Sequence, residues 1–436
     1  MKKYYPLSLL ILLLLSIYPN ISFAQGPGNL FVDAGPDVVI PCGTGGCADI
    51  TANYLEIFET FTTNYTVESI PYDPPFPFNG LSNSINITTD DIWGPAENLP
   101  FDFCFFGNLE TQFMVGSNGV IAFDVGPAGT GNGWAFSENL PNNSNPTLGE
   151  ANVFTPGHDI DPSVSTTNEI GWEILGAYPN RVLVVSYFAV PYFSCNSLRA
   201  THMAVFYEFS NVIEIYIQDK PVCSGWNGGN AVVGIQNNAG NIAYVPPGRQ
   251  TSDSPWTATN EAWSFAPSGA ETFVFEWLDS TGTVIGTSDT INVCPSGGSE
   301  IYTARVTYTN TCNGDIVILT DDVLVTVDAP FIVDLGPDVT DCDSGADVLL
   351  DADQGDPTFT YQWFLNAAPI PGATNPTYLV TSPNSGTYSV EVIDPADPLC
   401  PGIDSVDINY ITSPVIASPP IDIAICDDGA TPGIFD

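Results

Sequence analysis

Basic residues and histidines are scarce in this chain of 436 residues. Lysine and arginine together number 7 and histidine 2, against 50 aspartates and glutamates, and the formal net charge is −43. This charge repels phosphate backbones and anionic membrane surfaces, so we expect no nucleic-acid partner. Acidic excess is also typical of disordered chains, but 44% hydrophobic and 12% aromatic residues predict packed cores instead.

His158 and His202 are the only histidines, the residue type whose ordinary pKa lies near neutral pH, which leaves two candidate bases for hydrolysis of the Ser-His-Asp type. We expect His158 to be a loop histidine hydrogen-bonded to a neighbouring carboxylate and His202 to lie at the start of a strand. No Gly-x-Ser-x-Gly nucleophile motif accompanies either residue. Carboxylate pairs suited to glycoside hydrolysis would occur by chance among 50 acids. We therefore predict a protein that is not an enzyme.

Hydrophobic runs long enough to cross a bilayer are absent. The one long apolar stretch, residues 7–17, is too short to span a ~30 Å hydrocarbon core. Lys2 and Lys3 precede it and Ser22-Phe23-Ala24 follows it, the layout of a secretory signal peptide cleaved near Ala24. We expect a secreted or cell-surface protein whose mature chain has no membrane span.

Helical periodicity is nearly absent, and short alternating runs take its place. Ile213, Ile215 and Ile217 alternate with residues that point to the opposite face, and residues 302–308 repeat this pattern. The 39 glycines and 38 prolines supply turns between such runs. The sequence predicts an all-β protein of tandem β-sandwich modules.

An opening phrase occurs twice at domain-like spacing. Gly35-Pro36-Asp37-Val38 runs on to Cys42, and Gly336-Pro337-Asp338-Val339 runs on to Cys342. A related Pro-bounded segment precedes Cys426. Such recurrence predicts an array of modules, each with its own first strand and core.

The first large module contains a predicted hairpin over residues 113–123. Its Asn118-Gly119 pair favours a type I′ turn, and its apolar flanks place it in the core. Residues 124–168 are rich in Gly, Asn, Pro and Ser and predict long surface loops. A meander of strands follows, over 181–190, 203–209, 212–218, 231–236 and 242–245. This strand count predicts a sandwich or jelly roll.

A later module resembles the immunoglobulin fold. Trp363 lies in an apolar run, and Ser385-Gly386-Thr387-Tyr388 resembles the tyrosine corner of that fold. The resemblance implies that Trp363 packs across two sheets and that the Tyr388 hydroxyl bonds to the backbone. Val390 stands where an antibody domain has its second core cysteine, so any disulfide must lie nearer the edge of the module.

Three further motifs occur in order along the chain. The first is the segment 99–107, which leads into Val115-Gly116-Ser117-Asn118-Gly119-Val120-Ile121. The second combines residues 179–187, 213–220 and 226–237, and the third combines residues 247–249 and 260–265. With the immunoglobulin-like or PKD-like module that follows, they resemble the N-terminal part of adhesin-like surface proteins that gliding bacteria export by the type IX secretion system. They resemble nidogen-like extracellular domains more weakly. The resemblance implies export by that secretion machinery and modules that adhere or act as spacers.

The predicted organisation is one large jelly-roll-like or nidogen-like sandwich followed by smaller immunoglobulin-like or PKD-like sandwiches. The segments are a signal peptide at 1–24, a lead-in at 25–49, a large β-sandwich domain at 50–268, a small β-module at 269–329, an immunoglobulin-like or PKD-like domain at 330–411, and the start of a further truncated module at 412–436.

The predicted function is adhesin-like: the protein binds an extracellular glycan or protein, or spaces a binding head from the cell. The loops at 124–168 are the expected contact region. A secreted carbohydrate-active enzyme, or a carbohydrate-binding protein with accessory immunoglobulin-like modules, is the alternative. For this alternative the candidate glycan-stacking residues are Trp226, Trp256 and Trp263, although large aromatics in sandwiches are more often core.

The ten cysteines predict disulfides, because the compartment outside the cytoplasm is oxidising. A zinc site is not expected, since no Cys-x-x-Cys repeat accompanies histidine. Proximity in the sequence favours Cys42 with Cys47, Cys195 with Cys223, Cys294 with Cys312, and Cys342 with Cys400. We expect Cys104 to be a buried free thiol and the partner of Cys426 to lie beyond residue 436.

Two acidic loops are candidate calcium sites, since calcium prefers carboxylate oxygens. One contains Asp159 and Asp161. The other contains Asp351, Asp353 and Asp356 around a glycine, without the later bidentate glutamate of a calcium-binding loop. Solvated acidic turns are the alternative for both, and no other cofactor is expected.

Overall fold

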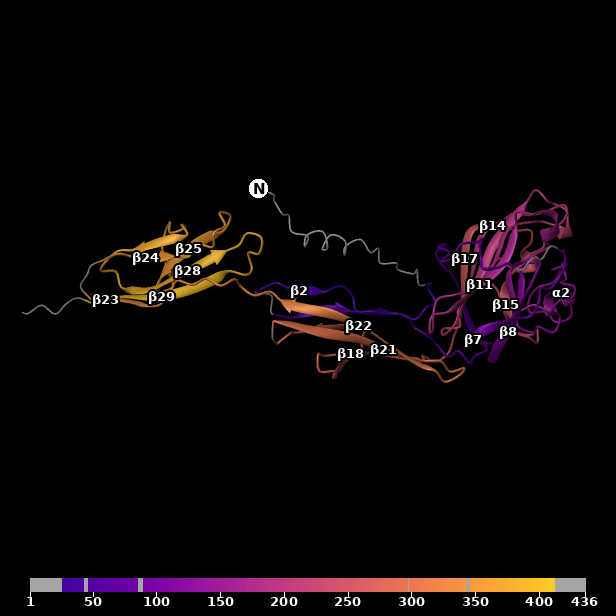
Figure 1. Ribbon diagram of the computed structural model, residues 1–436, viewed down its shortest axis with the longest axis horizontal. Helices are drawn as coiled ribbons and strands as arrows, with labels where there is room; N and C mark the ends of the chain where they lie inside the picture. The colour runs from indigo at the N-terminus through magenta and orange to yellow at the C-terminus, as the bar shows by residue number, and fades with distance from the viewer. Residues whose placement is uncertain (1–25, 43–45, 85–88, 297, 343–345, 412–436) are drawn as a thin grey trace, which may run out of the picture. The chain divides into compact units, whose positions relative to one another are not determined.

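The structure is a computed structural model that describes residues 26–42, 46–84, 89–296, 298–342 and 346–411 (Figure 1). The predicted signal peptide and the segment 412–436 with Cys426 lie outside the described residues. Nearly every element in these described ranges is a strand; the exceptions there are α2 (Pro146–Gly149) and three short 3-10 helices, η1 (Pro162–Val164), η2 (Asn227–Gly229) and η3 (Thr251–Asp253). The all-β prediction is confirmed.

The chain forms two compact units. Unit 1 comprises the chain up to Pro36, Ile50–Ile291 and Ile301–Val323. Unit 2 comprises Asp37–Asp49, Asn292–Glu300 and the chain from Leu324 onward. None of the helices in the described part of the chain has the length and apolar character needed to cross a bilayer.

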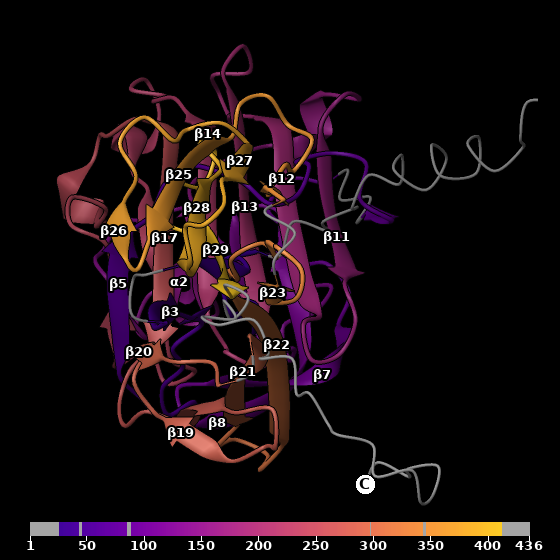
Figure 2. The ribbon, with the colours of Figure 1, turned by 90° about the vertical axis from the view of Figure 1, so that its left-hand side faces the viewer.

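The head, which we define as residues 65–267 of unit 1, is a sandwich of two sheets. The first has the order β16 (Ala243–Tyr244), β15 (Val232–Gln236), β10 (Val153–Gly157), β9 (Val120–Ala122), β8 (Asn108–Gly116) and β7 (Glu97–Phe105). The second has the order β5 (Tyr65–Ser69), β17 (Ala258–Pro267), β14 (Ile213–Lys220), β13 (Arg199–Tyr207), β12 (Val182–Pro191), β11 (Glu169–Leu175) and β6 (Asn83–Ser84). Figure 2 shows β17, β14, β13, β12 and β11 side by side.

Both faces of the second sheet are buried, which explains the continuous apolar run in β12. Leu183, Val185 and Tyr187 face the core between the two sheets. The alternate residues Val182 and Val184 belong to a separate cluster on the opposite face. Apolar residues of the segment 70–81 cover that face. A strand covered on both sides loses the apolar–polar alternation of a half-exposed strand.

The predicted hairpin at 113–123 is present, with Gly116 opposite Val120 and Val115 opposite Ile121. Its residues are buried, as expected. The predicted type I′ turn is wrong. That turn needs positive φ at two central residues, and in the segment 117–119 only Gly119 has one (φ 75°).

The small module takes strands from both sides of the head. Its later strands are β18 (Phe273–Leu278), β19 (Val284–Gly286), β20 (Thr290–Val293), β21 (Ser299–Thr309) and β22 (Ile316–Val327). Before the head come β1 (Val32–Asp33), β2 (Val38–Ile40), β3 (Ala48–Thr51) and β4 (Asn53–Tyr54). The Tyr54 ring stacks on Phe275 at 4.5 Å, and the Tyr308 hydroxyl donates to the Phe31 carbonyl at 2.8 Å. The predicted lead-in therefore packs with residues that follow the head.

The immunoglobulin-like module lies in unit 2. One sheet has the order β23 (Val339–Cys342), β29 (Gly402–Ile411), β28 (Gly386–Ile393), β25 (Thr360–Leu365) and β26 (Ala368–Pro369), and the other pairs β24 (Val348–Asp351) with β27 (Thr377–Val380). Trp363 is fully buried, with its ring 5.6 Å from that of Tyr378 on the other sheet. The Tyr388 hydroxyl donates to the Asn384 carbonyl at 3.2 Å, which confirms the predicted corner.

The two repeated opening phrases have the same structural role. β2 runs parallel to β22 with Val38 opposite Val325, and β23 runs parallel to β29 with Val339 opposite Ile408. The aspartate of each phrase accepts a backbone N–H from that partner strand: Asp37 Oδ1 from Leu324 and Asp338 Oδ1 from Asp407. The repeat therefore marks a first strand that joins the last strand of its own module.

Disulfides are present, but most of the predicted pairs are wrong. Among the described residues the pairs are Cys42–Cys400, Cys47–Cys294, Cys104–Cys312 and Cys195–Cys223, and of these the last was predicted. Cys104 is a bonded half-cystine and not a free thiol. Sequence proximity failed because the segments before and after the head pack together, which brings distant cysteines within bonding distance.

Candidate functional site

Three carboxylates from two distant segments meet in the head. Asp90 and Asp91 precede β7, and Asp159 follows β10. One carboxylate oxygen from each lies within 4.8 Å of the others, and we call these three residues the acidic cluster. Asp159 is buried, while Asp90 and Asp91 are half-buried. Asp159 was a predicted site residue, whereas Asp90 and Asp91 carried no motif that singled them out.

Asn118 in the hairpin turn ties the two segments together. Its Nδ2 donates to Asp91 Oδ1 at 2.8 Å, and its Oδ1 accepts the Ile160 N–H at 3.1 Å. Gly119 beside it has positive φ, and a side chain there would meet the Pro156 carbonyl at 2.1 Å. The Ser-Asn-Gly phrase is therefore needed for close backbone packing as well as for positioning the acids.

The two oxygens of Asp159 differ in their surroundings. Oδ2 accepts a hydrogen bond from the Trp226 indole at 2.6 Å, and Oδ1 has no partner among the described residues. Burial raises the pKa of Asp159 to about 7, with further contributions from Asp91 and Asp90, against the opposing effect of the indole. Burial and the charge of Asp91 likewise raise the pKa of Asp90 to about 6. Negative charge at the cluster is unfavourable without a cation.

Aromatic rings lie next to the acidic cluster. The Trp226 ring centre is 5.8 Å from that of Trp134 and 4.9 Å from that of Phe193. Trp134 is 42% exposed, and the Asn227 side chain donates to its carbonyl at 3.2 Å. A small cleft of about 10 Å³ opens here, lined by His158, Asp159, Tyr192, Cys223, Trp226, Asn227, Gly229 and Asn230. Trp134 was missed as a site residue, although it lies within the predicted contact loops at 124–168.

The other predicted stacking residues lie elsewhere. Trp256 is buried, and its ring contacts Lys220 at 4.1 Å and Arg249 at 4.7 Å from the ring centre. Trp263 is half-buried on β17 and donates to Glu261 at 2.5 Å. The Lys220 and Arg249 side chains therefore cover the Trp256 ring, whereas Trp226 lies beside the exposed Trp134.

The remaining predicted calcium ligands make local turns. Asp161 Oδ1 caps η1 by accepting the Ser163 N–H at 2.8 Å. Asp351, Asp353 and Asp356 each accept a backbone N–H from the residue two positions later. No group of three ligand atoms within 4.8 Å includes any of these four residues, as far as the structure describes the chain.

The two histidines are fully enclosed. His158 Nδ1 lies 3.0 Å from the Pro156 carbonyl, and not from a carboxylate as expected. His202 Nδ1 lies 3.0 Å from the Thr155 hydroxyl. Burial lowers the pKa of His202 to about 3 and that of His158 well below its usual range. Both rings are therefore neutral at physiological pH and are sealed from solvent.

Lys220 is a buried cation with no carboxylate partner among the described ion pairs. Its Nζ donates to the Trp256 carbonyl at 2.8 Å. Burial, and then the charge of Arg249, lower the pKa of Lys220 to about 7; His158 and His202 also interact with it electrostatically. Between pH 7 and 10.5 the unfolded chain binds a proton that the folded protein lacks, so stability rises with pH across this window.

Lys220→Met is therefore expected to be more stable than the wild type at pH 7, by roughly 1–4 kcal/mol, the range for replacing buried charges with apolar side chains. This advantage should shrink as the pH approaches about 9.5, because wild-type Lys220 is neutral there and the unfolded chain begins to lose its proton. Urea titrations of both proteins across this range measure the difference. A difference in the free energy of unfolding between the two proteins that stays constant with pH would contradict the lowered pKa of Lys220.

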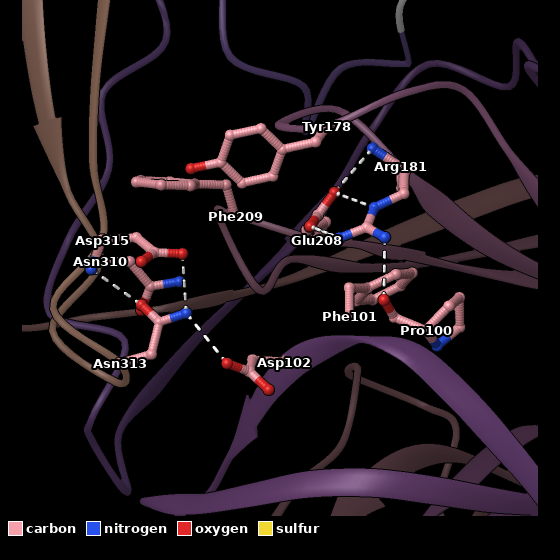
Figure 3. A pocket seen from close by; sticks show the side chains of 10 residues that line it. All are labelled: Pro100, Phe101, Asp102, Tyr178, Arg181, Glu208, Phe209, Asn310, Asn313 and Asp315. Atoms are coloured by element: carbon pink, nitrogen blue, oxygen red, sulfur yellow. Dashed lines mark hydrogen bonds and ion pairs between the residues drawn. The ribbon is translucent and has the colours of Figure 1, made fainter.

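A second pocket, of about 170 Å³, lies where the head meets the turn at 310–315 of the same unit (Figure 3). Arg181 forms an ion pair with Glu208 and donates to the Pro100 carbonyl at 2.8 Å. Asn313 donates to Asp102 at 3.1 Å, across the gap between the turn and β7. The bond between Asn313 and Asp102 links the turn to β7, close to the Cys104–Cys312 disulfide.

A comparison with known protein families found a match in the head. Residues 64–277 match the sequence model of the family described as NIDO related. This range contains both sheets of the sandwich and the acidic cluster, so the nidogen-like resemblance is confirmed for this part of the chain. No curated protein matches the chain.

Solved structures with low similarity to this chain include modules described as fibronectin(III)-like and as Ig domains. The fibronectin(III)-like modules of Clostridium thermocellum CbhA share 17% identity over 34% of this chain and 83% of that chain, with a TM-score of 0.16. The N-terminal four Ig domains of Dscam1 isoform 9.44 share 10% identity over 87% and 72%, with a TM-score of 0.17. Bacteroides ovatus SGBP-B, in complex with a mixed-linkage heptasaccharide, shares 17% identity over 32% and 38%, with a TM-score of 0.12. Scores this low carry no information on function.

Proposed function

We propose that this chain is an extracellular surface protein that binds and spaces rather than catalyses, with the head as its recognition domain. Four disulfides, the nidogen-related head and an immunoglobulin-like module support an extracellular role. Signal-peptide cleavage near Ala24 and export by the type IX machinery of gliding bacteria are part of the proposal and rest on the sequence resemblance.

The observation that carries the proposal is the exposed Trp134 beside Trp226. Trp134 lies on a loop at 42% exposure, whereas the strands β10 and β13 of the head are almost wholly buried. Exposed aromatics on loops of a rigid scaffold provide contact area at low entropic cost. We call Trp134, Trp226 and Phe193 the aromatic face, and we place recognition there.

A non-catalytic role agrees with the state of the two histidines. His158 and His202 are sealed from solvent and hold depressed pKa values, so neither is suited to exchange protons with a substrate at neutral pH. A carbohydrate-active enzyme remains the competing proposal, because Asp159 and Asp90 lie together with raised pKa values. Steady release of reducing ends from a polysaccharide by the purified protein would favour the enzyme and overturn the binding role.

Carbohydrate is the favoured ligand class for the aromatic face, since sugar rings stack on exposed tryptophans. Glycan arrays and whole-cell adhesion assays with the purified protein test binding. Trp134→Ala is expected to weaken binding at least about tenfold, which corresponds to ~1.4 kcal/mol. Tyr178→Ala is the matched control, because Tyr178 is an equally exposed aromatic (53%) at the separate pocket of Figure 3. Equal losses of ligand affinity in Trp134→Ala and Tyr178→Ala would show that the aromatic face is not the recognition site.

A further inference from the structure

We propose that the carboxylates of the acidic cluster bind one calcium ion that joins the segment at 90–91 to the segment at 159. The cluster belongs to the head, and the inference needs no macromolecular ligand. It therefore stands apart from the proposed adhesive role.

The spacing of the acidic cluster suits a calcium ion. Calcium binds oxygens at ~2.3–2.6 Å, so two oxygens on one ion lie at most about 5.2 Å apart. One carboxylate oxygen each from Asp90, Asp91 and Asp159 lies within 4.8 Å of the other two. A single ion can therefore contact all three without rearrangement of the backbone.

The Asp159 carboxylate is buried, and only one of its two oxygens has a partner among the described residues. This residue is 7% exposed, and its Oδ1 has no hydrogen-bond partner in the part of the chain that the structure describes. A buried carboxylate oxygen without a partner is costly. Because the Trp226 indole holds Oδ2, Oδ1 is the oxygen left free for a ligand.

No ion pair among the described residues compensates the charge of the acidic cluster. The described ion pairs are Arg181–Glu208, Arg249–Glu261 and Arg305–Glu276, and none of them involves the cluster. Its described hydrogen-bond donors, Asn118, Trp226 and a backbone N–H, are all neutral. Buried charges are normally paired or coordinate a metal. A bound cation supplies the missing charge.

The donor set selects the metal. All three groups are carboxylates, which suits a hard cation and disfavours zinc, whose protein sites use sulfur and nitrogen. Magnesium is usually bound through one or two carboxylates and several waters. Three protein carboxylates in one cluster favour calcium, and the half-buried Asp90 and Asp91 leave access for the waters that complete its shell.

The ion also stabilises the fold around it. The segment at 91–94 is already tied to both neighbouring loops, since the Asn132 N–H donates to the Asp91 carbonyl and the Gly94 N–H to the Val115 carbonyl, each at 2.8 Å. Calcium therefore adds a cross-link from Asp159 to a segment that hydrogen-bonds to the hairpin and to the loop before Trp134. Cation binding should raise the melting temperature of the head.

The test uses the full purified chain. In the wild type, Ca²⁺ at about 100 times its Kd is expected to raise the melting temperature of the head by roughly 5–10 °C relative to chelator. Tb³⁺, which replaces calcium in oxygen sites, should luminesce on tryptophan excitation because Trp226 contacts Asp159, and added Ca²⁺ should quench this signal.

Two variants and a control locate the ion. Asp159→Asn and, separately, Asp91→Asn are expected to weaken Ca²⁺ binding at least about tenfold. Asp353→Asn removes the same charge from an exposed turn outside the cluster and should bind Ca²⁺ like the wild type. If Asp159→Asn does not fold, the comparison of Asp91→Asn with Asp353→Asn decides the question.

Three results would overturn the proposal. The first is a wild type with neither a Ca²⁺-dependent melting shift nor a sensitised Tb³⁺ signal. The second is equal loss of binding in Asp353→Asn and in the cluster variants. The third is a rise in melting temperature with Mg²⁺ as large as that with Ca²⁺ at the same concentration, because such a rise would reflect general screening of the acidic chain.

Discussion

Removal of the Cys104–Cys312 disulfide is expected to lower the free energy of unfolding of unit 1 by about 5 kcal/mol, on the chain-entropy account of cross-links. The bond spans 208 residues, so its loss frees a long loop in the unfolded chain. Cys104 is fully buried, and its N–H donates to Asn211 at 2.6 Å. The bond also joins the head to the turn at 310–315, whose other links are hydrogen bonds such as that between Asn313 and Asp102.

The double variant Cys104→Ala/Cys312→Ala, measured by urea unfolding followed by tryptophan fluorescence, checks this expectation. Cys195→Ala/Cys223→Ala is the control, because that bond spans only 28 residues and should contribute about 3–4 kcal/mol. Mass spectrometry of the alkylated wild type must find all four pairs. If the Cys104→Ala/Cys312→Ala variant lost less free energy of unfolding than the control, loop length would not determine how much each disulfide stabilises the fold.

Trp363→Ala is expected to destabilise the immunoglobulin-like module by about 3–5 kcal/mol and to leave the melting of the head unchanged. The Trp363 side chain is completely buried, contacts Tyr378 across the two sheets and donates to the Asn375 carbonyl at 2.9 Å. Its removal leaves a large cavity in the core. The head and the immunoglobulin-like module have separate hydrophobic cores, so the melting temperature of the head should not change.

Calorimetry of the full chain can separate the two transitions, with the head assigned by its response to Ca²⁺ if the calcium site is confirmed. Ile403→Ala is the matched control: Ile403 is 64% exposed on β29 of the same module, and its truncation should cost less than about 0.5 kcal/mol. If Trp363→Ala lowered the melting temperature of the head as well, the modules would not be independent.

Local patterns predicted the strands and the packing of the immunoglobulin-like module well. Trp363 and Tyr388 occupy the positions that the fold requires, and the strand pattern at 181–218 corresponds closely to β12, β13 and β14. These features depend on residues near one another in the sequence, whose alternation follows directly from backbone geometry. The repeated Gly-Pro-Asp-Val phrases were informative for the same reason.

Disulfide pairing and the composition of the site could not be predicted in this way. Asp159 was singled out from its own loop, but Asp90 and Asp91 lie almost seventy residues earlier in an unremarkable segment. Only Asn118, between them in sequence, shows why they meet, and its role as a bridge is visible only from its hydrogen bonds. Cys42 and Cys47 likewise bond to residues more than two hundred positions away.

The sequence alone therefore determined the fold class, the modular plan and the scarcity of groups suited to proton transfer, because composition and short-range periodicity set these properties. Which carboxylates gather, which tryptophan remains exposed and which cysteines bond was decided by tertiary packing. The physical reason is that these pairings depend on contacts between sheets and between segments on either side of the head, and such contacts leave no periodic trace along the chain.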